Sequence, residues 1–137
     1  MRELSEVRLI WIAGAIQAGI VLVNGILPGR LRVREHMKSL PIFIRQIFYV
    51  HWAYIVLTVG LFSALCFGFA HDLAGASALG RFLSGFMGGF WLLRVALQWF
   101  YYDREVRRAN RWLDALYLAS LIALSFIFTR AAFVPVA

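Results

Sequence analysis

The sequence has few charged residues and almost no cysteine. Asp, Glu, Lys and Arg make up only 15% of its 137 residues, whereas 62% are apolar. A soluble domain of this length is about one quarter charged, so most soluble folds are excluded, together with a disordered chain. The single cysteine, Cys66, excludes an internal disulfide and a cysteine-rich metal site. The composition indicates a membrane protein.

Carboxylates and histidines are also scarce, with seven Asp and Glu and three His in the chain. No nucleophile, carboxylate pair or metal cluster lies in the middle of an apolar run, so we do not expect an enzyme. His36 and His71 fall in or beside loops at opposite ends, far from His51. A haem between two histidines and a zinc site with three or four converging ligands are therefore not expected. The cofactor, if there is one, stays unknown.

What the sequence does have is long apolar runs. A transmembrane helix needs about 20 apolar residues, and four such runs use nearly all of the chain. They cover residues 9–27, 43–70, 79–103 and 112–133. The first run is followed by Pro28 and Gly29, which we expect to halt the helix. We predict an all-α polytopic membrane protein, a four-transmembrane-helix bundle that forms one integral membrane domain over residues 1–137.

Basic residues are distributed unevenly between the connections, and the net charge is +7. Loops 28–42 and 103–111 are rich in arginine, so the positive-inside rule places both in the cytoplasm. The two termini then lie on the other side, which is the periplasm if the membrane is a bacterial inner membrane. We expect the basic loops to contact anionic lipid head groups, not nucleic acid. The loop residues counted are Arg30, Arg32, Arg34, Lys38, Arg45, Arg104, Arg107, Arg108 and Arg111.

Arg94 is the most unusual residue, because it lies inside the third apolar run. A guanidinium in such a segment costs at least about 2.5 kcal/mol unless something compensates it. Helical side chains lean toward their own N-terminus, which directs Arg94 away from the nearer, cytoplasmic interface. Three explanations stay open: the side chain reaches the interface, it joins a closed hydrogen-bond network with a group such as Asp114, or a bound ligand completes its surroundings.

Further polar and aromatic residues share the depth of Arg94. If consecutive spans two and three pack antiparallel, His51 lies level with Arg94, and Gln46 lies level with Gln98. We therefore predict a ligand-binding site in the cytoplasmic half, with Arg94 as the partner of an anion or carbonyl. A cation surrounded by aromatic rings would suit a lipid, a quinone or a similar small amphiphile. The predicted site residues are Arg94, His51, Gln98, Tyr101, Trp91 and Tyr54.

Glycines and other small residues recur at four-residue spacing in the third span. Gly80, Ser84 and Gly88 form one such row, and Gly85 with Gly89 forms another. Rows of this kind let helices approach closely, within one bundle or between protomers. Two other functions therefore stay open: an accessory or assembly subunit of a larger membrane complex, and a homo-oligomeric small transporter or channel. No run of the sequence spells a motif that assigns it to a family of known activity.

Overall fold

The computed structural model describes residues 1–136, apart from the side chain of Val106, and most of these residues are helical. The four long helices are α1 (Arg2–Arg30), α3 (Ile42–Gly68), α5 (Ala78–Phe100) and α7 (Arg111–Phe133). The short ones are α2 (Val33–His36), a 3₁₀ turn η1 (Met37–Ser39), α4 (Ala70–Ala74) and α6 (Arg104–Ala109). Within the described range the only strand-like pairing is an isolated bridge between Gly75 and Val136. The predicted all-α class is confirmed.

Three of the long helices, α1, α3 and α7, are long and apolar enough to cross a membrane. Helix α5 is as long as α7, at 23 residues, but it does not meet the same standard of composition. The reason is that α5 contains Arg81, Arg94 and Gln98 in addition to four glycines. Length and composition therefore support three of the four predicted spans.

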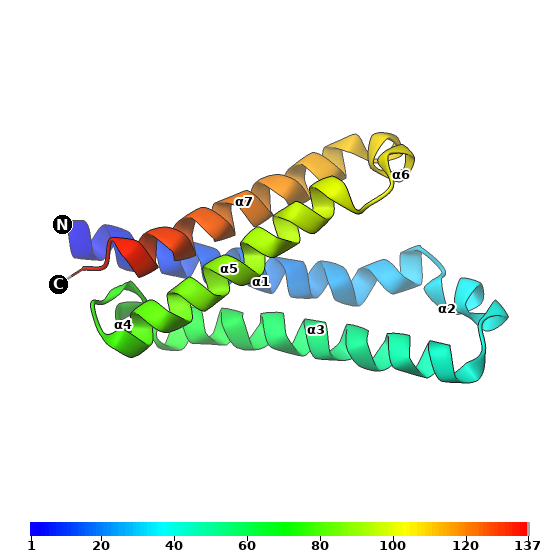
Figure 1. Ribbon diagram of the computed structural model, residues 1–137, viewed down its shortest axis with the longest axis horizontal. Coiled ribbons are helices and arrows are strands. Elements are labelled where there is room, and N and C mark those ends of the chain that lie inside the picture. Colours follow the sequence, from blue (N-terminus) through cyan, green and yellow to red (C-terminus); the bar gives the residue numbers. More distant parts are fainter. Residues whose placement is uncertain (137) are drawn as a thin grey trace.

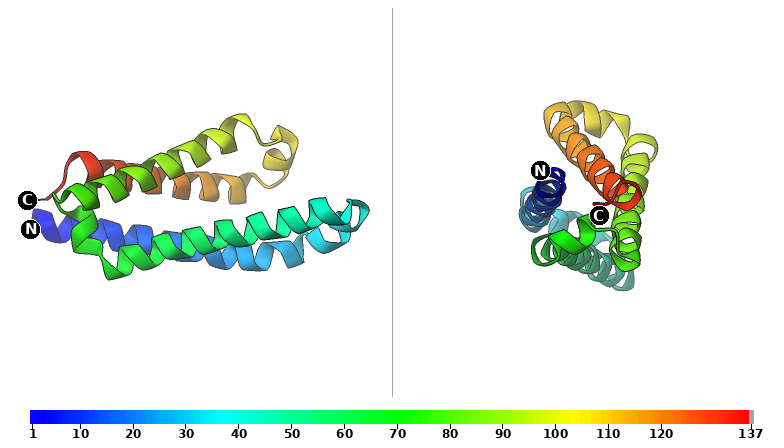
Figure 2. Two further views of the ribbon diagram at one scale, coloured as in Figure 1. Left: turned by 60° about the horizontal axis from the view of Figure 1, so that its bottom comes forward. Right: turned by 90° about the vertical axis from the view of Figure 1, so that its left-hand side faces the viewer.

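The long helices form two antiparallel hairpins (Figure 1). Helix α1 packs along α3 and is joined to it through α2 and η1, whereas α5 packs along α7 and is joined to it through α6. Helix α4 connects the hairpins at the end of the molecule where both termini lie. Toward α2 and α6 the two hairpins separate, as Figures 1 and 2 both show.

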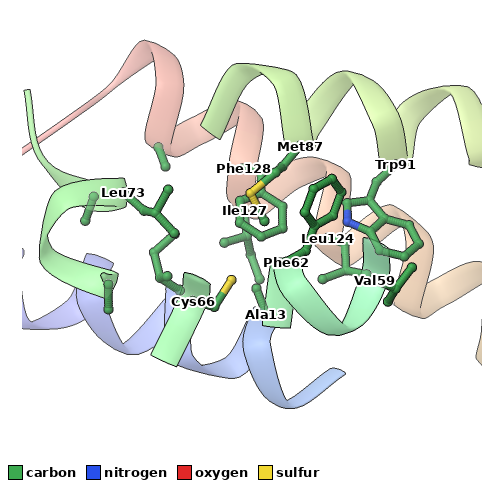
Figure 3. Packing of buried hydrophobic residues seen from close by; sticks show 14 of the residues in the cluster. Ala13, Val59, Phe62, Cys66, Leu73, Met87, Trp91, Leu124, Ile127 and Phe128 are labelled. Carbon is green, nitrogen blue, oxygen red and sulfur yellow. The ribbon is translucent and has the colours of Figure 1, made fainter. Parts of the chain in front are cut away.

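The hydrophobic core lies at the end of the molecule that contains the termini. Phe62 of α3 packs edge to face on Phe90 of α5, with ring centroids 5.2 Å apart. Toward α2 and α6 burial is sparse: in the described chain, no residue between Ile42 and Thr58 of α3 is buried, and none of α7 before Leu121. Figure 3 shows the interlocking side chains, which are Ala13, Val59, Phe62 and Cys66 of the first hairpin and Met87, Trp91, Leu124, Ile127 and Phe128 of the second.

Two small residues of α5 permit this close packing. A methyl group added at Gly80 would overlap the carbonyl oxygen of Asp72, and one added at Gly88 would lie 3.0 Å from Oγ1 of Thr129. Gly80 therefore lets α5 approach α4, and Gly88 lets it approach α7. Gly89 is different, since no atom lies within 4 Å of the position of its missing Cβ. The row that contains Gly80 and Gly88 is a packing face inside the molecule.

An ion pair joins α1 to α7 at the same end. Arg130 donates from Nη2 to Oε1 of Glu6 at 2.6 Å, and its Nε lies 3.1 and 3.2 Å from the two carboxylate oxygens. The Glu6 side chain is only 6% exposed, whereas that of Arg130 is 40% exposed. A buried carboxylate needs a counter-ion, so Arg130 compensates the one acidic group that α1 places in the interface.

Two helix ends differ from the sequence prediction. Pro28 and Gly29 do not halt α1, which continues to Arg30 with Pro28 in its last turns. Proline lacks an N–H, but its backbone angle suits a helix, so near the end it removes only one hydrogen bond. Helix α5 ends at Phe100, before the predicted Asp103, because the Asp103 carboxylate accepts from the Glu105 N–H at 2.7 Å and caps α6 instead.

The ion pair makes a testable prediction about stability. Arg130→Leu is expected to lower the free energy of unfolding, because Glu6 is left buried without its counter-ion. The double variant Glu6→Leu with Arg130→Leu should recover much of that loss, since neither charge remains. Unfolding in mixed micelles with increasing dodecyl sulfate measures both values. A double variant that is less stable than Arg130→Leu alone would contradict this role of the pair.

Candidate functional site

Arg94 lies half-buried on α5, toward the α6 end where the hairpins separate. Its guanidinium carbon is 5.0 Å from the ring centroid of Tyr102, which follows the end of α5. It is 5.7 Å from the ring centroid of Tyr117 on α7. Both distances are typical of cation–π contacts. Both tyrosines belong to the same hairpin as Arg94.

The N–H groups of Arg94 have no hydrogen-bond acceptor among the residues that the structure describes. A guanidinium carries five N–H donors, and a cation–π contact satisfies none of them as a hydrogen bond would. Two other helical arginines have an acceptor: Arg81 donates to the Ala132 carbonyl at 3.0 Å, and Arg130 pairs with Glu6. Arg94 differs from both in having none among the described residues.

A second polar group lies one helical turn beyond Arg94. Gln98 donates to Oδ1 of Asp114 at 2.7 Å, and Arg107 donates from Nε to both oxygens of that carboxylate at 3.1 and 3.0 Å. The side chains of Arg107 and Asp114 are only 19% and 15% exposed, and the guanidinium of Arg107 lies 5.3 Å from the Trp99 ring centroid. Both oxygens of Asp114 are thus occupied. The pairing of Arg94 with Asp114 that the sequence left open is not formed.

A cavity of about 440 Å³ lies beside this network, between the end of α5, α6 and the start of α7. Its wall is mainly cationic, with one aromatic ring and one carboxylate. The lining residues are Trp99, Arg104, Arg107, Arg108, Arg111 and Asp114.

Besides Arg94, three of the predicted site residues lie on or next to α5: Trp91, Gln98 and Tyr101. Trp91 is buried in the core, and its Nε1 donor has no partner among the described residues. Gln98 belongs to the Asp114 network. Tyr101 is 80% exposed, and its ring contacts that of Tyr102 at 6.0 Å between centroids. Tyr102 therefore connects Tyr101 to Arg94.

The structure does not bring His51 and Tyr54 of α3 to Arg94. Both are exposed, and Nδ1 of His51 lies 2.8 Å from the Ile47 carbonyl oxygen of its own helix. Proximity of His51 to Arg94 would require spans two and three to pack along each other. Helix α3 packs along α1 instead, and it meets α5 only near the terminal end, so residues at equal depth do not become neighbours.

The cavity at α6 was not predicted from the sequence, although a signal for it is visible there. Arg104, Arg107 and Arg108 lie in the short helix and Arg111 follows it, with Trp99 just before them. From the sequence these arginines predicted the orientation of the chain and contacts with anionic lipid head groups, but not a cavity. Their convergence depends on the turn that begins at Tyr101 and on the capping of α6 by Asp103, and neither was expected.

No protein-family model matches the chain, and neither a curated protein nor a solved structure is significantly similar to it. Within residues 1–136, no group of three or more His, Cys, Asp and Glu side chains gathers as metal ligands would.

The Asp114 network gives a second testable prediction. Asp114→Asn removes the charge that Arg107 pairs with, so the junction of α5, α6 and α7 should open more often. Backbone amides of α6 and of the first turn of α7 are expected to exchange hydrogen about tenfold faster. Asp103→Asn is the matched control, because asparagine caps helices as well as aspartate does. Equal exchange rates in the two variants would show that the network has no such role.

Proposed function

We propose that the protein is a multi-pass membrane protein of four spans that binds a lipid, a quinone or a similar small amphiphile at Arg94. Support for the fourth span comes from packing: α5 lies along α7 over the same length, so a crossing by α7 would take α5 with it. The basic segments around α2 and α6 favour a cytoplasmic position for that end. The termini would then be periplasmic, in a bacterial inner membrane.

One observation supports binding more than any other: the half-buried guanidinium of Arg94 lies between two tyrosine rings and has no acceptor for its N–H groups among the described residues. In apolar surroundings an uncompensated guanidinium is costly. A carboxylate, a phosphate or a carbonyl oxygen would compensate it through charge-assisted hydrogen bonds. An amphiphile that presents such a group from the bilayer is therefore the favoured ligand class.

The neighbouring side chains suit the apolar part of such a molecule. In this proposal Tyr102 and Tyr117 orient the Arg94 guanidinium and flank the ligand. Trp91 is buried in the core, so its unpaired Nε1 would reach a ligand only if that packing opened. Sparse burial on the α2 and α6 side lets an amphiphile enter sideways from the membrane. Gln98 acts indirectly, since it fixes Asp114 away from Arg94.

His51 and Tyr54 can contact the proposed ligand only after a change in the arrangement of the hairpins. Both lie on the exposed surface of α3, on the other hairpin. They would reach a ligand at Arg94 only if the two hairpins approached each other at the α2 and α6 ends.

Substitution of Arg94 tests the proposal. The purified protein is titrated with dioctanoyl phosphatidylglycerol and with decylubiquinone, and tryptophan fluorescence reports the Kd for each. Arg94→Leu is expected to raise the Kd of the bound probe about tenfold or more, which corresponds to about 1.4 kcal/mol. Arg94→Lys should recover part of the affinity, because it keeps the charge but not the planar fork of donors.

Arg8→Leu is the matched control, since Arg8 is exposed on α1 near the opposite end. It should leave the Kd unchanged. An Arg94→Leu protein that folds, gains stability and keeps both its affinity and its co-purified lipid would contradict the proposal. A wild-type protein that binds neither probe would contradict it as well.

A further inference from the structure

The cavity at α6 is a second site, separate from Arg94, which does not line it. Its volume of about 440 Å³ falls within the range of small-ligand sites. It lies where α5 ends and α7 begins, just beyond the apolar segments of the second hairpin. If α5 and α7 cross the bilayer, the cavity lies at the depth of the lipid head groups.

The cavity has an excess of positive charge. Arg107 is neutralised by Asp114, with Nη2 3.0 Å from Oδ2. The other three arginines, Arg104, Arg108 and Arg111, are exposed and have no hydrogen-bonding or ionic side-chain partner among the described residues. Like charges around one space repel each other, and an anion between them would convert that repulsion into attraction.

The Asp114 carboxylate does not oppose an anion in this cavity. Its two oxygens already accept hydrogen bonds from Arg107 and Gln98, and Arg107 cancels its charge. The Trp99 ring forms a further wall and contacts Arg107 through its face. The free donors of the cavity are therefore guanidinium groups.

We propose that this cavity binds a phosphate group. A phosphate monoester carries a charge of about −1.5 to −2 and three strong acceptor oxygens, which match three convergent guanidinium groups. A carboxylate offers one charge and two oxygens and would leave part of the repulsion in place. Planar guanidinium forks bind phosphate through paired hydrogen bonds, as a lysine cannot. The phosphate belongs either to a lipid head group such as phosphatidic acid or to a soluble phosphorylated compound.

The experiment compares two double variants of the full chain, purified in a neutral detergent. Arg108→Gln with Arg111→Gln removes two cations from the cavity. Arg30→Gln with Arg34→Gln removes two exposed cations at the same end of the molecule but outside the cavity. Calorimetric titration uses inorganic phosphate, dihexanoyl phosphatidic acid and, as the zwitterionic reference, dihexanoyl phosphatidylcholine. The cavity variant is expected to bind phosphatidic acid about tenfold more weakly than wild type, and the control variant less than about twofold more weakly.

Each outcome decides the proposal. Binding of phosphatidic acid alone supports it and identifies a lipid phosphate, whereas binding of inorganic phosphate as well supports it and shows that the phosphate group suffices. Equal losses in the two double variants overturn it, because attraction by the net charge would explain them. The absence of binding to either phosphate probe in wild type also overturns it. The Arg94→Leu variant should bind phosphatidic acid in the cavity as wild type does, so this proposal can fail without the amphiphile site failing.

A measurement on the unaltered protein covers the case in which the cavity variant does not fold. Phenylglyoxal modifies arginines, and mass spectrometry locates the modified residues. Phosphatidic acid is expected to slow the modification of Arg108 and Arg111 but not that of Arg30 and Arg34. Equal protection of all four, or protection of none, would overturn the proposal.

Discussion

Two helical hairpins pack against each other at one end only, and the other features of the structure depend on this constraint. Phe62 of α3 and Phe90 of α5 pack edge to face in this part of the molecule, and the Glu6–Arg130 ion pair joins α1 to α7 in the same half. Apolar burial and a compensated charge thus act at the same place. Because α4 is the short connection between the hairpins, the chain also holds them close at this end (Figure 1). The opposite half of each helix has few buried partners.

The separation of the hairpins affects which polar side chains of the second hairpin find a hydrogen-bond partner. Arg81 lies at the packed end and finds a carbonyl acceptor, whereas Arg94 lies further along the same helix, between two tyrosine rings and with no acceptor among the described residues. Gln98, one turn beyond Arg94, donates a hydrogen bond to Asp114, and Arg107 forms an ion pair with the same carboxylate. In the second hairpin the guanidinium groups without an acceptor among the described residues are therefore those of Arg94 on α5 and of the three cavity arginines, Arg104, Arg108 and Arg111. The two proposals assign an amphiphile to the first and a phosphate to the second.

Much of the fold could be predicted from the sequence, because each long helix coincides with an apolar run. The sequence also singled out Arg94, since a guanidinium in such a run needs a compensating partner; its role as a binding residue stays a prediction. The neighbours of Arg94 could not be predicted. A periodic stripe defines one face of a helix but not which helix covers it, so His51 was placed opposite Arg94 although α3 packs along α1. Tyr102 reaches Arg94 only because α5 ends at Phe100, three residues earlier than expected.

The separation of the hairpins can be measured directly with pairs of spin labels in a Cys66→Ser background. One pair, at Gln46 and Trp112, lies near the α2 and α6 ends, and a second pair, at Phe67 and Phe133, lies near the termini; all four side chains are exposed. Double electron–electron resonance in lipid nanodiscs should give a clearly longer and broader distance distribution for the first pair than for the second. Equal and equally narrow distributions would show hairpins packed side by side along their whole length, which contradicts this account.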